Sequence, residues 1–179
     1  GRRVYKAMSL ASIPTVEILD IPFGIGSLDL LAEATLSGRG LITAPSAPVL
    51  ALTIKDSAYT KQLAESTFAI PDSSAMALTW NLFNRQTPVT RVSGLAFLKK
   101  LLADGRMREP DALFLVDPTN TSSKLNGEWL RRQGFEMSAR TQYIAPIYPR
   151  GSVEDQALLT LLLEQQPRYV LINLGGGIQ

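Results

Sequence analysis

The feature that most constrains this chain is an alternation of short, apolar, β-rich runs with longer segments of helical periodicity. The runs predict strands at 15–21, 40–45, 67–72, 111–117, 141–148 and 168–174. The intervening segments predict helices at 26–40, 47–56, 57–66, 73–84, 92–105, 121–134 and 152–166. Such alternation is typical of a mostly parallel sheet with helices on both faces. We therefore predict a single-domain, Rossmann-like α/β fold.

Length and composition support one domain. The chain has 179 residues, of which 45% are hydrophobic, and this is enough for one substantial core. No internal repeat or linker divides it, so we predict a single domain over 1–179, with an irregular segment at 1–14. The last predicted helix, 152–166, starts with a capping-box pattern from Ser152 to Asp155.

Two predicted helices have a well-defined apolar face. In 73–84, spacings of four and three residues place Met76, Trp80 and Phe83 on one side. The predicted apolar face of 92–105 consists of Leu95, Leu98, Leu101 and Leu102.

The composition limits the chemistry that this chain can perform. It has neither cysteine nor histidine, which excludes thiolate chemistry and the commonest general base and metal ligand. Proton transfer must then use a carboxylate, lysine, tyrosine or water. The net charge is +2, with basic residues scattered, so nucleic acid is a poor candidate for a partner. No apolar run reaches the ~20 residues of a membrane span, and we expect a cytoplasmic protein.

Polar residues or glycines follow four of the predicted strands. They are Thr43, Asp72, Asp117 and the segment 175–179. In α/β sheets ligands bind beyond the carboxyl ends of the strands. Strand ends also turn through such residues for structural reasons alone, so a single one favours a structural role.

Asp72 is open to two interpretations. It can cap the helix that begins near Ser74, by accepting backbone N–H bonds. It can also act as a general base at the strand end. Capping is the commoner role, but Ser73 and Ser74 can cap this helix as well.

Two further patterns suggest binding of phosphate groups. Arg91 precedes a helix start, where a cation and backbone N–H groups can hold phosphate, although a surface arginine is an equally good interpretation. Gly175 and Gly177 follow the last strand, like the first two glycines of a dinucleotide fingerprint. A nicotinamide-dependent oxidoreductase is the weakest of the functions that we consider.

The order of these elements resembles the WecG/TagA/CpsF family of bacterial glycosyltransferases. The matching stretches are "GLITAPSAPVLAL", "FAIPDSSAMALTW", "TRVSGLAFLKKLL" and "YVLINLGGGIQ". They correspond to the family's Thr-rich strand end, Pro-Asp turn, Arg-x-x-Gly helix start and closing Leu-Gly with a nearby Gln. The resemblance extends from about Val16 onward.

The resemblance implies an inverting, metal-independent transfer of a sugar of the N-acetylmannosamine type from a UDP donor, without a cofactor. The implied acceptor is a polyprenyl-diphosphate-linked sugar at the inner face of the cell membrane, so we expect peripheral membrane contact, and family members tend to self-associate. Asp72 would be the general base. The substrate-binding residues would be Thr43, Arg91, Gly175, Gly176 and Gln179.

The chain departs from the family pattern at several positions. Pro45 stands where an Asn is usual, and Ser73-Ser74-Ala75 stands where the family tends to have Gly-x-Gly. Asp117 lies in a segment that is often glycine-rich, where it would repel a diphosphate unless it binds a hydroxyl. We also expect this chain to lack the family's basic carboxyl-terminal extension. Pro45 and the missing Gly-x-Gly motivate an alternative function, a catalytically silent domain that binds a nucleotide or a partner.

Overall fold

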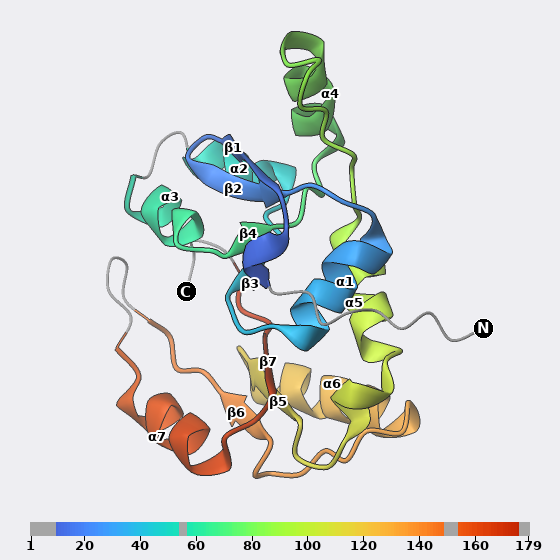
Figure 1. Ribbon diagram of the computed structural model, residues 1–179. Coiled ribbons are helices and arrows are strands. Elements are labelled where there is room, and N and C mark those ends of the chain that lie inside the picture. Colours follow the sequence, from blue (N-terminus) through green and yellow to red (C-terminus); the bar gives the residue numbers. More distant parts are fainter. Residues whose placement is uncertain (1–9, 54–56, 149–153, 176–179) are drawn as a thin grey trace, which may run out of the picture. The chain divides into compact units, whose positions relative to one another are not determined.

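Two sheets organise the chain. The computed structural model describes residues 10–53, 57–148 and 154–175, and the chain divides into two compact units, 1–101 and 102–179 (Figure 1). Each unit has its own sheet, and all strand pairs but one are parallel. The predicted α/β class is confirmed. That the two units make one domain stays a prediction.

The sheet of the first unit, sheet A, has four strands in the order β1-β2-β4-β3. These strands are β1 (Thr15–Ile18), β2 (Ile21–Gly24), β3 (Ile42–Thr43) and β4 (Phe68–Ala69). Strand β4 runs parallel to both β2 and β3, whereas β1 pairs with β2 in the antiparallel direction. The carboxyl ends of β3 and β4 therefore lie side by side.

The prediction of one strand over 15–21 is wrong, because the chain reverses inside it. Leu19 and Asp20 have φ values of 55° and 61°, and they form a two-residue turn between β1 and β2. Hairpins of this kind usually have Asn or Gly at the turn. Leu19 gives no such signal, since a bulky residue seldom adopts positive φ.

Helices pack on both faces of sheet A. The helices in this part of the chain are α1 (Leu28–Ser37), α2 (Ala47–Thr53), α3 (Ser57–Ala64), α4 (Ser74–Phe83) and α5 (Gly94–Leu102). A short 3-10 helix, η1 (Leu10–Ser12), precedes the sheet. The side chains of Leu31 and Phe68 meet beside Gly24, which places α1 on one face. Leu50 and Leu63 pack with Phe23 and the other face of the sheet.

Two predicted apolar faces need correction. Met76 packs against the core cluster of sheet A, but Phe83 is exposed and does not share that environment. In α5 the buried face contains Phe97 and Leu101, and Leu95 is exposed. Phe97 has the largest apolar side chain in α5, so the helix turns this residue, rather than Leu95, into the core.

The sheet of the second unit, sheet B, has three parallel strands in the order β6-β5-β7. Its elements are η2 (Gly105–Arg108), β5 (Leu113–Asp117), α6 (Asn120–Arg132), β6 (Gln142–Ile144), α7 (Gln156–Gln165) and β7 (Tyr169–Ile172). Phe114 and Val116 pack with leucines of α7, whereas Asp117 bonds to Asn126 of α6. Because neighbouring strand residues face opposite sides, the two helices cover opposite faces.

Helix α7 begins differently from the predicted capping box. Asp155 is itself the N-cap residue and accepts a hydrogen bond from the Leu158 N–H, and Ser152 lies outside the described residues. The hydroxyls of Tyr143 and Tyr148 also donate to the Asp155 carboxylate. Burial alone would raise the pKa of Asp155, but these hydrogen bonds hold it below the ordinary value of 3.8.

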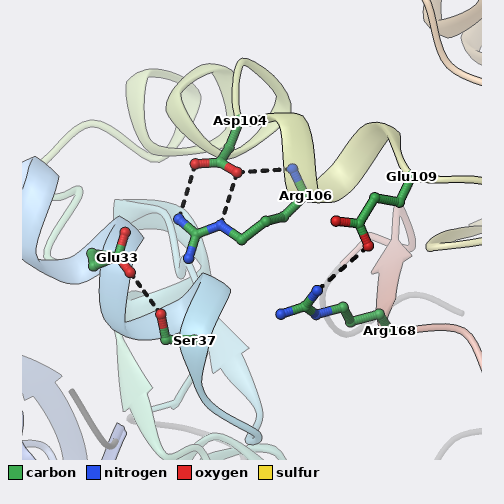
Figure 2. A network of polar contacts seen from close by, with 6 residues as sticks. All are labelled: Glu33, Ser37, Asp104, Arg106, Glu109 and Arg168. Atoms are coloured by element: carbon green, nitrogen blue, oxygen red, sulfur yellow. Dashed lines mark hydrogen bonds and ion pairs between the residues drawn. The ribbon is translucent and has the colours of Figure 1, made fainter. Parts of the chain in front are cut away.

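Ion pairs support the chain before and after β5. Arg106 donates to both carboxylate oxygens of Asp104, at 2.9 Å each, and this side-chain bond lowers the pKa of Asp104 (Figure 2). Arg168 forms a looser pair with Glu109 at 3.6 Å. Among the residues that the structure describes, no helix is long and apolar enough to cross a membrane.

Candidate active site

Asp72 lies just beyond the carboxyl end of β4, as predicted. Residues 68–71 are buried, and the Ile70 N–H donates to the Thr43 carbonyl at 2.7 Å, which extends the β3–β4 pairing by one residue. The Asp72 N–H then donates to the Ile70 carbonyl at 2.9 Å, so the chain turns here. The Asp72 side chain emerges from this buried strand end with 27% of its surface exposed.

Asp72 does not cap the helix that follows, so the capping interpretation is wrong. The N-cap of α4 is Ser73, whose hydroxyl accepts a hydrogen bond from the Met76 N–H at 3.2 Å. Ser73 is buried in this role. The side chain of Ser73 is thus folded into the cap, and the Asp72 carboxylate is not used by α4.

Arg91 binds Asp72 at two points. Its Nε donates to the Asp72 carbonyl oxygen at 2.9 Å, and its Nη2 donates to Oδ1 of the carboxylate at 3.0 Å. The Val92 N–H donates to the Pro71 carbonyl at 3.1 Å, which aligns the two segments. Sequence separates Arg91 from Asp72 by 19 residues, and the fold brings them together.

The second oxygen of Asp72 lies close to the start of α5. A Cβ atom at Gly94 would be 3.1 Å from Asp72 Oδ2 and 3.3 Å from the Ala44 Cβ, so only glycine leaves this space open. Among the described residues, none donates a hydrogen bond to Oδ2. The positive end of the helix favours a negative charge here. Sequence reasoning did not single out Gly94, although the Arg-x-x-Gly spacing carried the signal.

The other predicted site residues are less closely associated with Asp72. Thr43 is joined to this strand end by its backbone, but its hydroxyl bonds with the Ser66 hydroxyl at 3.0 Å. Gly175 follows β7 in the second unit and is exposed. Gly176 and Gln179 lie outside the described residues. The roles assigned to these four residues stay predictions.

Asp117 ends the central strand of sheet B and is completely buried. Its Oδ1 accepts hydrogen bonds from the side-chain amides of Asn126 at 2.8 Å and Asn173 at 2.9 Å. Within the described parts of the chain, its Oδ2 has no partner. Sequence reasoning identified Asp117 but missed both asparagines. The described contacts make it a clamp between β5, α6 and the end of β7.

The geometry around Asp72 suits a proton acceptor. One carboxylate oxygen is held by a guanidinium, and the other is free of hydrogen bonds from the described residues. The backbone carbonyl bond to Arg91 also fixes the position of the residue. A base must be held within hydrogen-bond reach of the hydroxyl that it deprotonates, and a partly exposed, fixed carboxylate meets this requirement.

Comparison with known proteins connects this site to a family. A search of curated proteins finds no match. A model of the glycosyl transferase WecG/TagA/CpsF family matches residues 16–179, which include Asp72, Arg91 and Gly94. The match confirms the resemblance seen in the sequence, and it extends over both sheets. The chain therefore belongs to the WecG/TagA/CpsF family of glycosyl transferases.

Proposed function

We propose that this chain transfers a sugar of the N-acetylmannosamine type from a UDP donor to a polyprenyl-diphosphate-linked acceptor, with inversion and without a metal. Family membership supports sugar transfer in the synthesis of cell-surface polysaccharide. The observation that carries the proposal is the environment of Asp72. Arg91 fixes this residue at a strand end, and Ser73 caps α4 in its place. One oxygen of the Asp72 carboxylate accepts no hydrogen bond from the described residues.

In the proposed reaction, an acceptor hydroxyl attacks the anomeric carbon from the side opposite to UDP. The hydroxyl proton passes to Asp72 as the new carbon–oxygen bond forms. The bond between the anomeric carbon and the β-phosphate oxygen breaks, and UDP leaves with the electron pair. Arg91 would offset the charge that develops on the leaving diphosphate. Thr43, Gly175, Gly176 and Gln179 would position the substrates.

The experiment measures sugar transfer from a UDP-sugar to a short-chain lipid-diphosphate acceptor. Asp72→Asn should lower the rate by about a hundredfold or more, because the amide cannot accept the proton. UDP binding, measured by calorimetry, should persist. Asp20→Asn is the matched control, since Asp20 is exposed in a turn that tolerates asparagine. Undiminished transfer by Asp72→Asn would remove this residue from the mechanism.

A catalytically silent binding domain is the second candidate. It is favoured by the ion pair, since Arg91 already neutralises one oxygen of the supposed base. Under this alternative the wild-type chain binds UDP and transfers no sugar to any lipid-linked acceptor offered. Calorimetry and the transfer assay together separate the two functions.

A further inference from the structure

The part of the first unit that follows Asp72 forms a projecting arm. We define the α4 arm as residues 74–89, that is, α4 together with the segment that returns from it (Figure 1). Of α4, only Ala77 is buried. Leu78, Leu82 and Phe83 are 72%, 66% and 77% exposed. Leu78 and Leu82 are four residues apart, so they lie on one side of the helix.

The polar side chains of the α4 arm bind its own backbone. The Trp80 indole N–H donates to the Thr87 carbonyl at 2.8 Å. The Asn81 amide donates to the Val89 carbonyl at 3.0 Å, and its oxygen accepts from the Val89 N–H at 2.8 Å. These bonds tie the returning segment to α4. Trp80 and Asn81 thus direct their polar groups to the returning segment, while the large apolar side chains of Leu78, Leu82 and Phe83 are exposed.

The arm has one charged residue. Residues 74–89 contain Arg85 and no Asp, Glu or Lys. Arg85 lies two residues after Phe83 and lines a hollow with Leu82 and Phe83. It has no carboxylate partner among the described residues. Exposed leucine and phenylalanine beside a cation, without carboxylates, are complementary to the surface of an anionic bilayer.

We propose that the α4 arm docks on anionic lipid membranes through its tip, by inserting Leu82 and Phe83 below the headgroups, with Arg85 at phosphate level. The ten residues of α4 span about 15 Å, and Asp72 precedes its first turn. Insertion of the tip by ~5–10 Å would therefore hold Asp72 just above the headgroups. The docking stands by itself; its link to catalysis rests on the proposed function.

The test measures co-sedimentation of the full chain with vesicles of phosphatidylcholine and phosphatidylglycerol, and with phosphatidylcholine alone. We expect binding to the anionic vesicles that weakens with salt. The double variant Leu82→Ser, Phe83→Ser should bind about tenfold more weakly or worse. Arg85→Glu should also bind more weakly.

Matched controls come from the second unit. Leu125 and Leu163 are 61% and 72% exposed, so Leu125→Ser with Leu163→Ser removes a similar exposed apolar surface. Arg132→Glu reverses an exposed charge on α6, as Arg85→Glu does on the arm. Both controls should retain vesicle binding. Equal losses in the control and arm variants, or no vesicle binding by the wild-type chain, would overturn the proposal.

A second readout locates the contact. In Trp129→Phe the remaining tryptophan is Trp80 of the arm, and brominated lipids should quench its fluorescence. Unquenched Trp80 in bound protein would show that another face docks. Sedimentation analysis without vesicles tests whether the arm binds a second copy of this chain instead of a membrane. The proposal fails if the arm variants abolish self-association and leave lipid binding unchanged. UDP binding and sugar transfer are measured without vesicles, so they do not depend on membrane docking. A failure of docking can therefore be distinguished from a failure of the proposed function.

Discussion

The Arg91 guanidinium donates to both the carbonyl oxygen and a carboxylate oxygen of Asp72, at 2.9 and 3.0 Å. The first bond fixes the backbone of Asp72, and the second fixes its side chain. One arginine thus determines where the free carboxylate oxygen lies. The consequence is that Arg91 positions the proposed base, besides any role toward a leaving diphosphate.

Arg91→Lys should lower the rate of sugar transfer by about tenfold or more, because an ammonium cannot reproduce the two-point contact. The free energy of unfolding should change by less than about 1 kcal/mol, since the pair is half-exposed. Urea unfolding and the transfer assay measure the two effects. Arg168→Lys is the control, because Arg168 is also 49% exposed and its carboxylate partner is Glu109. Equal rates in both variants would contradict the prediction.

Gly94→Ala should separate stability from activity. The new methyl group would lie 3.1 Å from Asp72 Oδ2 and push the carboxylate aside, so transfer should fall by about ten- to a hundredfold. Stability should change by less than about 1 kcal/mol, because the helix propensity of alanine at the first position of α5 offsets the tight contact with the Ala44 Cβ. Gly105→Ala is the control, because nothing lies within 4 Å of a Cβ there. Unchanged transfer in Gly94→Ala would show that Oδ2 is not the reacting oxygen.

Substitution of Asp117 should reveal a structural clamp. Asp117→Ala leaves the side-chain amides of Asn126 and Asn173 without their acceptor, and should cost about 2–4 kcal/mol in urea unfolding. Asp117→Asn keeps an oxygen for both amides, and its new amide replaces an oxygen that lacks a partner among the described residues. It should cost less than about 1 kcal/mol. Equal costs for the two variants would show that the negative charge itself stabilises the fold.

The stability of the protein should decline in acid. Because hydrogen bonds hold the pKa of Asp155 below 3.8, its contribution is complete above that pH and is lost as the pH falls through the lowered pKa. Asp155→Asn still caps α7 but cannot be protonated, so it should flatten this decline. Asp104, whose pKa Arg106 also lowers, should retain its own acid dependence. Urea midpoints from neutral pH to below pH 3.8 provide the measurement; an equally steep decline in Asp155→Asn would contradict it.

The class of fold follows from local signals in the sequence, and its finer topology does not. Apolar runs such as 111–117 predict strands because burial and β propensity agree there. The sequence did not predict the hairpin at Leu19 and Asp20, because a leucine seldom adopts positive φ. The sequence did not predict that Phe83 is exposed, for a different reason. Periodicity shows which residues share a face of a helix, but not whether another element covers that face.

The same limit applies to the site. Asp72 was recognisable because a carboxylate at a strand end is chemically distinctive, whereas its contact with Arg91 and its clearance from Gly94 depend on tertiary structure. Whether Asp72 or Ser73 capped α4 was undecidable from composition, because both side chains can accept the bond. The asparagines that bind Asp117 lie 9 and 56 residues away in sequence, with no local pattern to mark them.

The antiparallel strand β1 has a consequence for how this chain behaves while it folds. Parallel sheets form slowly, and their open edges can recruit strands from neighbouring molecules. Here a two-residue turn pairs β1 with β2, so the antiparallel strand β1 is itself the edge strand on this side of sheet A. Glu17 in the middle of β1 adds an exposed charge to that edge. This short, charged edge strand should therefore disfavour strand pairing between molecules and so limit aggregation.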